Sequence, residues 1–217
     1  MGARVCLIHT LPSLAPLFSS LAPGSLELRH VVDEPLLERI RRRGRVEPVD
    51  VDRLAAHVEL AFDVGAAAVL VTCSNLSGCV DDLPDHQRPR VLPIDRPMLE
   101  EAARRGGRVV VLATNFGTLE PTRQSLRAVG PTLDPQMRLV EHAFDAFRQG
   151  DYAKHDRLLI EAIAELESSA DTIVLAQASM ARVVDQLSQA QRAKVLSSPH
   201  LALARLEELA RAHAVVS

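Results

Sequence analysis

Short apolar runs alternate with amphipathic segments along this chain, and together they predict buried strands separated by helices. The clearest run covers residues 66–71, Ala-Ala-Ala-Val-Leu-Val, and it ends in Thr-Cys-Ser-Asn at 72–75. An apolar run without alternating polar positions is typical of a strand that is covered on both faces of a parallel sheet. Similar stretches occupy residues 4–10, 108–118 and 171–180, so the pattern recurs in both halves of the chain.

The segments between these runs have the spacing of helices. Residues 51–65 place Leu54, Val58, Ala61 and Phe62 on one helical face. Further helices are expected over residues 13–21, 36–40, 97–105, 121–130, 151–168, 188–195 and 201–214. Weaker strands are expected at 26–32, 138–141 and 91–95, the last of which is too rich in proline for a central position. This alternation predicts an α/β fold with mainly parallel sheets.

The strand ends repeat along the chain. Thr10 and Cys73 are 63 positions apart (73 − 10), and so are Thr114 and Gln177 (177 − 114). Such a repeat predicts two similar α/β lobes that face each other, with the active site in the cleft between them. We expect an N-terminal lobe over residues 1–96, a C-terminal lobe over 97–199, and a C-terminal helix within 200–217 that packs back on the first lobe.

The composition fits a globular protein and argues against several functional classes. Apolar residues make up 47% of the chain and charged residues 24%, enough for two packed lobes. The net charge of −3, the lack of Trp and the single Tyr argue against nucleic-acid binding. Three irregularly spaced cysteines predict neither a disulfide framework nor a zinc site. Without a signal-peptide pattern or an apolar segment of about 18 residues, we expect a cytoplasmic protein that binds no membrane.

Cys73 is the main candidate for chemistry. It stands at the carboxyl end of a predicted strand and just before a predicted helix, where ligands bind in open α/β sheets. Free amides and the helix dipole at such a position lower the pKa of a thiol. The alternative is that Cys73 is one more small buried residue, since free cysteine often has that role. Position alone leaves both interpretations open.

Taken together, these motifs resemble those of the aspartate/glutamate/hydantoin racemase superfamily. Residues 72–75 match the first cysteine motif of that family, and the strand ends at 8–10 and 112–114 match two other loops. The resemblance covers nearly the whole chain. It implies two pseudo-symmetric flavodoxin-like lobes and cofactor-independent catalysis at the α-carbon of a small carboxylate or amino-acid derivative. It also implies a homodimer or a higher homo-oligomer.

One position departs from that family. Residues 175–179 read Leu-Ala-Gln-Ala-Ser where the family usually has Leu-Gly-Cys-Thr, so Gln177 replaces the second cysteine. Racemisation by two thiols needs an acid or base on each face of the substrate, and glutamine does not titrate. Cys79 follows Cys73 by only six residues, too close to take the place of the missing second cysteine, and we expect Cys79 to have a structural role. The resemblance therefore implies a divergent racemase or isomerase with Cys73 as acid/base; the alternatives are a one-base lyase, such as a decarboxylase, and a non-catalytic binder of small acids.

Substrate-binding groups are expected at the strand ends that match the family. They are Thr10, Ser74, Asn75, Thr114, Asn115, Thr118, Gln177, Ala178 and Ser179, with His9 as a further candidate that titrates near neutral pH. No metal ligands are expected. Asp33 and Asp95 also follow strands, but for them a solvated loop carboxylate is the more frequent structure.

Overall fold

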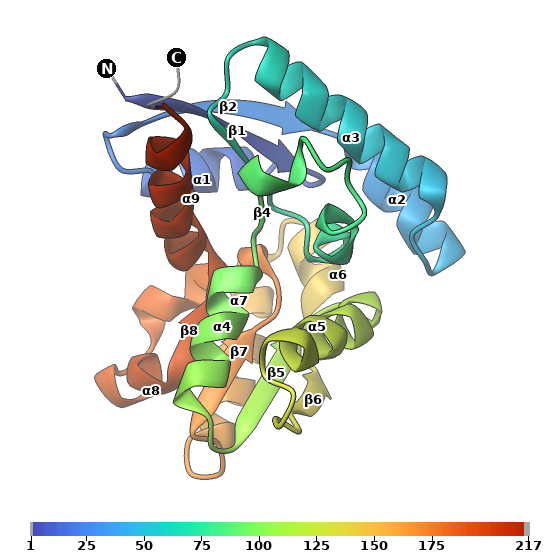
Figure 1. Ribbon diagram of the computed structural model, residues 1–217. Coiled ribbons are helices and arrows are strands. Elements are labelled where there is room, and N and C mark those ends of the chain that lie inside the picture. The colour runs from blue at the N-terminus through green and yellow to red at the C-terminus, as the bar shows by residue number, and fades with distance from the viewer. Residues whose placement is uncertain (1, 215–217) are drawn as a thin grey trace. The chain divides into compact units, whose positions relative to one another are not determined.

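The protein is an α/β molecule with two parallel sheets, as the pattern predicts. The computed structural model describes residues 2–214. Contacts divide the chain into a first unit, Met1–Arg96 with Pro199–Ser217, and a second unit, Pro97–Ser198. In the described residues, each unit carries one four-stranded parallel sheet with helices on its faces (Figure 1).

The first sheet has the strand order β2-β1-β3-β4. Its strands are β1 (Ala3–His9), β2 (Leu26–Val32), β3 (Ala68–Val71) and β4 (Val91–Pro93). Strand β3, buried along its whole length, and β1, buried from Val5 to His9, occupy the centre because their apolar runs need cover on both faces. The proline-containing β4 lies at an edge, where a missing N–H is tolerated, as predicted.

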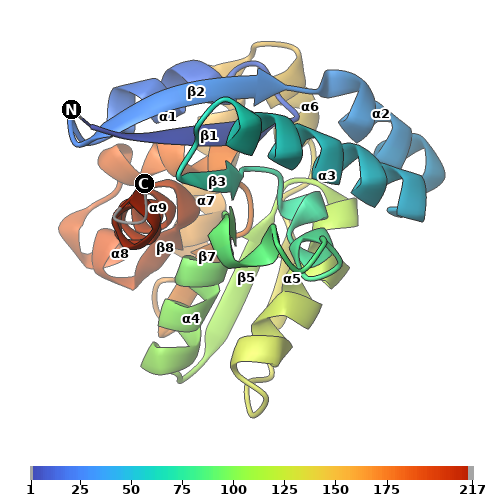
Figure 2. The same ribbon diagram turned by 45° about the horizontal axis from the view of Figure 1, so that its top comes forward.

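Helices cover the two faces of this sheet differently, as Figure 2 shows. On one face, α2 (Glu34–Arg43) and α3 (Pro48–Asp63) pack against β1 and β3 through Ile8, Val69 and Val71. The other face carries α1 (Leu14–Leu21), whose buried Phe18 contacts the ring of His9. The last helix, α9 (Ser198–Ala214), contacts the first unit through a hydrogen bond from Ser25 to Glu207.

The second sheet has the order β6-β5-β7-β8. Its strands are β5 (Val109–Ala113), β6 (Gln136–Leu139), β7 (Thr172–Leu175) and β8 (Val195–Ser197). Its helices are α4 (Arg96–Arg105), α5 (Phe116–Val129), α6 (Ala143–Arg148), α7 (Tyr152–Leu166) and α8 (Gln189–Lys194). Apolar side chains of α7 fill the core on the face of β5 that carries Val110 and Leu112.

The repeat in the sequence is a repeat of strand register. Val5 pairs with Ala68 in the first sheet, and Val109 pairs with Thr172 in the second. The paired residues are 63 positions apart in both sheets, and so are Thr114 and Gln177, which are hydrogen-bonded. The next strand also follows the same rule, since Val69 pairs with Val91 and Ile173 with Val195. Equal register in both sheets makes Gln177 the structural counterpart of Cys73.

Several predicted elements need correction. The helix expected after Cys73 is replaced by two 3-10 turns, η1 (Ser74–Leu76) and η2 (Gly78–Val80), because hydrogen bonds such as Leu76 N to Cys73 O span only three residues. Another 3-10 segment, η4 (Ala178–Gln186), follows β7, and a short one, η3 (Arg88–Arg90), precedes β4. The segment at 196–199, expected to be a loop, contributes β8.

Helix α5 also begins earlier than expected, since the side chain of Asn115 caps it and Pro121 lies inside it. Helix α6 was not expected, because six residues are too few for a clear helical pattern. None of the helices within residues 2–214 has the length and apolarity that crossing a membrane requires.

Candidate functional site

The ends of β1 and β3 bring Thr10 and Cys73 together. Both residues follow their strands at equal register, and both are buried, with Cys73 only 8% exposed. The side chain of Thr10 hydrogen-bonds with the Cys73 sulfur, which also receives the backbone N–H groups of Asn75 and Leu76. These two candidate residues, which the sequence relates only by their spacing, are therefore in direct contact.

The expected lowering of the Cys73 pKa is wrong. Burial raises the pKa of the thiol, the nearby charge of Asp95 adds to the rise, and the hydrogen bonds from Thr10 and the two amides oppose it without overcoming it. The physical reason is burial, which disfavours the charged thiolate and outweighs the hydrogen bonds; the following η1 is a three-residue turn and not the expected helix. Cys73 is therefore a neutral thiol at pH 7 and must lose its proton before it can act as a base.

Asp95 is buried beside this pair and is not the solvated loop residue expected. It follows β4, is 2% exposed, and burial raises its pKa to about 6. Its carboxylate accepts its own amide and that of Arg96. The Ser77 hydroxyl is close enough to oppose the rise in pKa, although it makes no hydrogen bond of ordinary geometry. Asp95 is therefore an acid–base candidate that the sequence analysis did not select. The feature of the sequence that pointed to it is its position directly after a strand.

His9 lies on the opposite face of the first sheet and does not act as predicted. Its Nδ1 bonds Thr72 Oγ1 at 2.8 Å and its Nε2 bonds His30 Nδ1 at 2.9 Å. The Thr72 hydroxyl already donates to the Ile8 carbonyl, so His9 Nδ1 must be the donor and its Nε2 the acceptor. Burial and the neighbouring His30 lower the pKa of His9 to about 3, so this neutral histidine holds the strands together.

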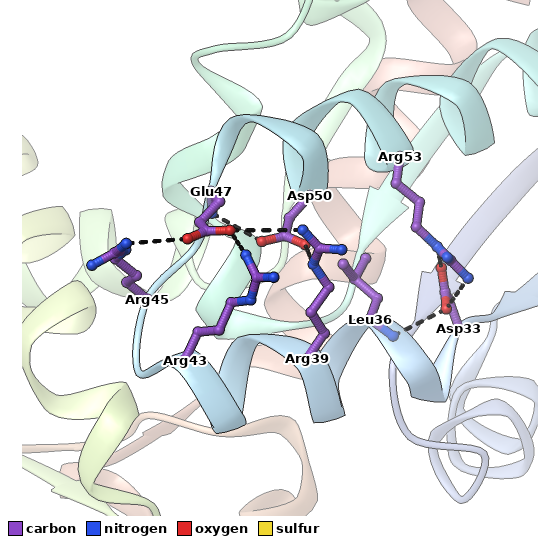
Figure 3. Close-up of polar contacts among 8 residues, drawn as sticks. All are labelled: Asp33, Leu36, Arg39, Arg43, Arg45, Glu47, Asp50 and Arg53. Atoms are coloured by element: carbon purple, nitrogen blue, oxygen red, sulfur yellow. Dashed lines mark hydrogen bonds and ion pairs between the residues drawn. The ribbon is translucent and has the colours of Figure 1, made fainter.

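Asp33, the other strand-end carboxylate, is also buried but has structural partners (Figure 3). It caps α2 by accepting the Leu36 amide and binds Arg53 through Nε and Nη2 at 2.6 and 2.9 Å. His57 Nε2 lies 2.8 Å from Asp33 Oδ2, the oxygen that also binds Arg53 Nε. Asp33 thus joins the start of α2 to α3.

The arginines at the end of α2 serve the same purpose. Arg43 and Arg45 pair with Glu47, and Arg39 Nε lies 2.7 Å from Asp50, as Figure 3 shows. These ion pairs join α2 and the residues after it to the N-cap and first turn of α3.

The second unit reproduces the pair with an amide in place of the thiol. The backbone N–H and the hydroxyl of Thr114 both donate to Gln177 Oε1, at 2.6 and 3.0 Å. Two donors on Oε1 fix the orientation of the amide and make its NH2 the donor for any further partner. The predicted residues Thr114 and Gln177 are therefore brought together.

The remaining predicted residues lie at the same strand ends. Asn115 accepts the Gly117 amide at 3.1 Å as the cap of α5, which occupies its side chain. Thr118 is buried in the first turn of that helix. Ser74 and Asn75 form η1 after Cys73, and Ala178 and Ser179 begin η4 after Gln177. Over residues 2–214, no group of three or more His, Cys, Asp or Glu side chains is arranged to hold a metal ion.

The fold has two parallel sheets with matched register, and the strand ends of one sheet carry a buried thiol and a buried carboxylate. Together these features define the class of α/β protein to which the chain belongs. The sequence model described as Asp/Glu/Hydantoin racemase matches residues 10–206, and the chain belongs to this family. A comparison with curated protein sequences finds no match.

Solved structures share the fold. The aspartate racemase of Picrophilus torridus has a TM-score of 0.73 and 14% identity, over 97% of this chain and 95% of that one. The glutamate racemase of Francisella tularensis, in complex with D-glutamate, has a TM-score of 0.70 and 10% identity, over 100% and 84%. A mutant of arylmalonate decarboxylase, in a form associated with sulfate ion, has a TM-score of 0.67 and 16% identity, over 96% and 93%.

Proposed function

We propose that this protein is a cofactor-independent racemase-like or isomerase-like enzyme that acts at the α-carbon of a small carboxylate or amino-acid derivative. Cys73 is its acid/base, and Gln177 occupies the opposing position. The observation that carries the proposal is the hydrogen-bonded Thr10–Cys73 pair, repeated at equal register as Thr114–Gln177. Strand ends with donors and one titratable thiol provide both binding and proton transfer.

The chemistry follows from the protonation states. A neutral Cys73 thiol donates a proton to a carbanion or enediolate formed at the α-carbon, and its thiolate removes the proton in the reverse direction. The hydroxyl of Thr10 stabilises the thiolate when it forms. The NH2 group of Gln177, oriented by Thr114, donates to a carboxylate oxygen of the substrate and takes no proton itself.

The test is α-proton exchange in deuterated water with aspartate, glutamate and allantoin as probes, followed by mass spectrometry and chiral chromatography. Cys73→Ser is expected to lower the exchange rate by about 100-fold or more, the range of general acid–base catalysis. Cys79→Ser is the control, since Cys79 is a buried thiol in the same core. An exchange rate that survives in Cys73→Ser contradicts the proposal.

Gln177 favours a second candidate, a one-base lyase such as a decarboxylase. Its amide stands at the register position of Cys73 and cannot return a proton to the opposite face of a substrate. A decarboxylase is also among the proteins that share the fold. Deuterium on a single face of the product supports the lyase, whereas deuterium on both faces supports the racemase.

A non-catalytic binder of small acids is the remaining alternative. Ligand-induced thermal stabilisation without any exchange or decarboxylation would support it. The homo-oligomer and the cytoplasmic location stay predictions; sedimentation velocity tests the first of them.

A further inference from the structure

Three neighbouring strands of the first sheet end at one level. The last residue pairs are Ile8 with Val71 between β1 and β3 and Val71 with Pro93 between β3 and β4, and Thr10, Cys73 and Asp95 each follow two residues later. The hydrogen bond from Ile94 N to Val71 O, at 3.0 Å, shows that the pairing extends beyond β4. Adjacent parallel strands lie about 5 Å apart, so side chains at equal register are neighbours.

The two groups interact electrostatically inside the protein. The negative charge of Asp95 raises the pKa of Cys73, which shows that each senses the proton of the other. Arg96 lies near Asp95, but its guanidinium is bound to Asp81 at 2.9 Å. Cys79, whose own pKa is raised by burial to about 11, is a neutral neighbour of Cys73.

We propose that Asp95 is the proton partner of Cys73: its carboxylate takes the thiol proton when the thiolate is needed and returns it afterwards. This inference rests on the proposed function, in which Cys73 transfers the proton of the substrate. It supplies a second titratable group to a site where the second cysteine of the family is replaced by Gln177.

The proton balance is complete within the pair and the substrate. The S–H bond of Cys73 breaks as an O–H bond forms on Asp95, and the thiolate then takes the α-proton, which breaks C–H and re-forms S–H. The electron pair of the C–H bond stays on the substrate as a carbanion. Returning a proton to carbon reverses these steps. Because two negative charges in one buried pair repel each other, protonating Asp95 also removes one of the causes that raise the pKa of the thiol, although burial raises it more.

Alkylation of Cys73 by iodoacetamide, followed from pH 4.5 to 9.5, tests this coupling without a substrate. Trypsin cleavage after Arg53 leaves Cys73 and Cys79 in one peptide, so Cys79→Ser is used as the background. The logarithm of the alkylation rate should rise with pH along two parallel lines joined by a shallower region near pH 6, where Asp95 loses its proton.

Asp95→Asn should remove the shallow region and raise the rate at pH 8 by about threefold to tenfold, because the lost charge no longer raises the thiol pKa. Asp95→Glu should keep the wild-type profile. Asp81→Asn is the matched control, since it removes an exposed carboxylate that binds Arg96. Identical pH profiles of alkylation for wild type and Asp95→Asn would overturn the inference. If Asp95→Asn does not fold, the inference is overturned when the wild-type profile is a single straight line without a shallower region.

The two proposals fail separately. If substrate exchange survives in Cys73→Ser while Asp95→Asn changes the alkylation profile, the proposed function is wrong and the proton pair stands. If Cys73→Ser abolishes exchange while Asp95→Asn leaves both exchange and alkylation unchanged, the proposed function stands and Asp95 has no part in it.

Discussion

At the scale of single residues, burial and not position decides which strand-end groups can do chemistry. His9, Asp33, Cys73 and Asp95 all end strands or directly follow them, but their partners differ. His9 is kept neutral by burial and by the neighbouring His30, and Asp33 is held ionised by Arg53 and His57. Of these four residues, only Cys73 and Asp95 have pKa values raised by burial, which suits them to exchange a proton.

Asp33 gives a prediction for stability. Burial alone would raise its pKa, but the hydrogen bonds from Arg53, His57 and the Leu36 amide hold it below the usual value. A lowered pKa in the folded state stabilises the protein above the unfolded-state pKa near 4, and this stability is lost as pH falls through the folded-state pKa. Asp33→Asn should therefore lower the free energy of unfolding at pH 7 by about 1–3 kcal/mol.

Urea unfolding at pH 7 and pH 3 measures this effect. The difference between wild type and Asp33→Asn should shrink at pH 3, because wild-type Asp33 is then approaching protonation. A difference that stays constant over this range would show that the ionised form contributes nothing.

At the scale of elements, local chemistry sets where helices begin and end. The Asp33 side chain caps α2, and Gly44 ends it in a left-handed conformation with φ of 72°, donating its N–H to Ile40 O. The start of α3 uses a reciprocal cap between Glu47 and Asp50, whose side chains also bind arginines of α2. One turn of polar residues therefore both ends one helix and joins it to the next.

Gly44→Ala tests the role of this turn. A Cβ at Gly44 meets no atom within 4 Å, so any loss of stability comes from the left-handed backbone, about 1 kcal/mol. Gly24→Ala is the matched control, because its Cβ is also free of contacts and its φ is not positive. Equal free energies of unfolding for the two variants would contradict this account.

At the scale of the whole molecule, one sheet design is used twice with different chemistry. Strands β3 and β7 begin 104 positions apart, and so do β4 and β8 (172 − 68 and 195 − 91). Under this relation, Cys73 of the first unit corresponds to Gln177 of the second, and Asp95 corresponds to Pro199. Cys73 and Asp95 follow adjacent strands of the first sheet, whereas Gln177 and Pro199, at the matching positions after strands of the second sheet, do not titrate.

Gln177→Cys should therefore change the stereochemical course of exchange. A thiol at this position adds the second acid–base group that racemisation requires. With a probe that the wild-type protein exchanges, we expect the deuterium to move from one configuration to both. Chiral chromatography of the product measures it, and Gln177→Ser, which adds no titratable group, is the control. If the stereochemistry of exchange is unchanged in Gln177→Cys, the side chain of residue 177 does not transfer a proton to the reacting carbon.

The sequence by itself determined most of the strands and helices, though not α6, β8 or the 3-10 turns after Cys73, together with the repeat of 63 positions and the family, because apolar runs and spacing are local properties of a chain. Because equal spacing becomes equal register in parallel sheets, the sequence also placed Thr10, Cys73, Thr114 and Gln177 at matching strand ends, but it did not predict their hydrogen bonds. The tertiary structure alone decided that His9 lies on the other face, that Cys73 is a neutral thiol, and that Asp95 is buried beside it. Burial and electrostatic coupling depend on segments far apart in the chain, which pack together only in the folded protein.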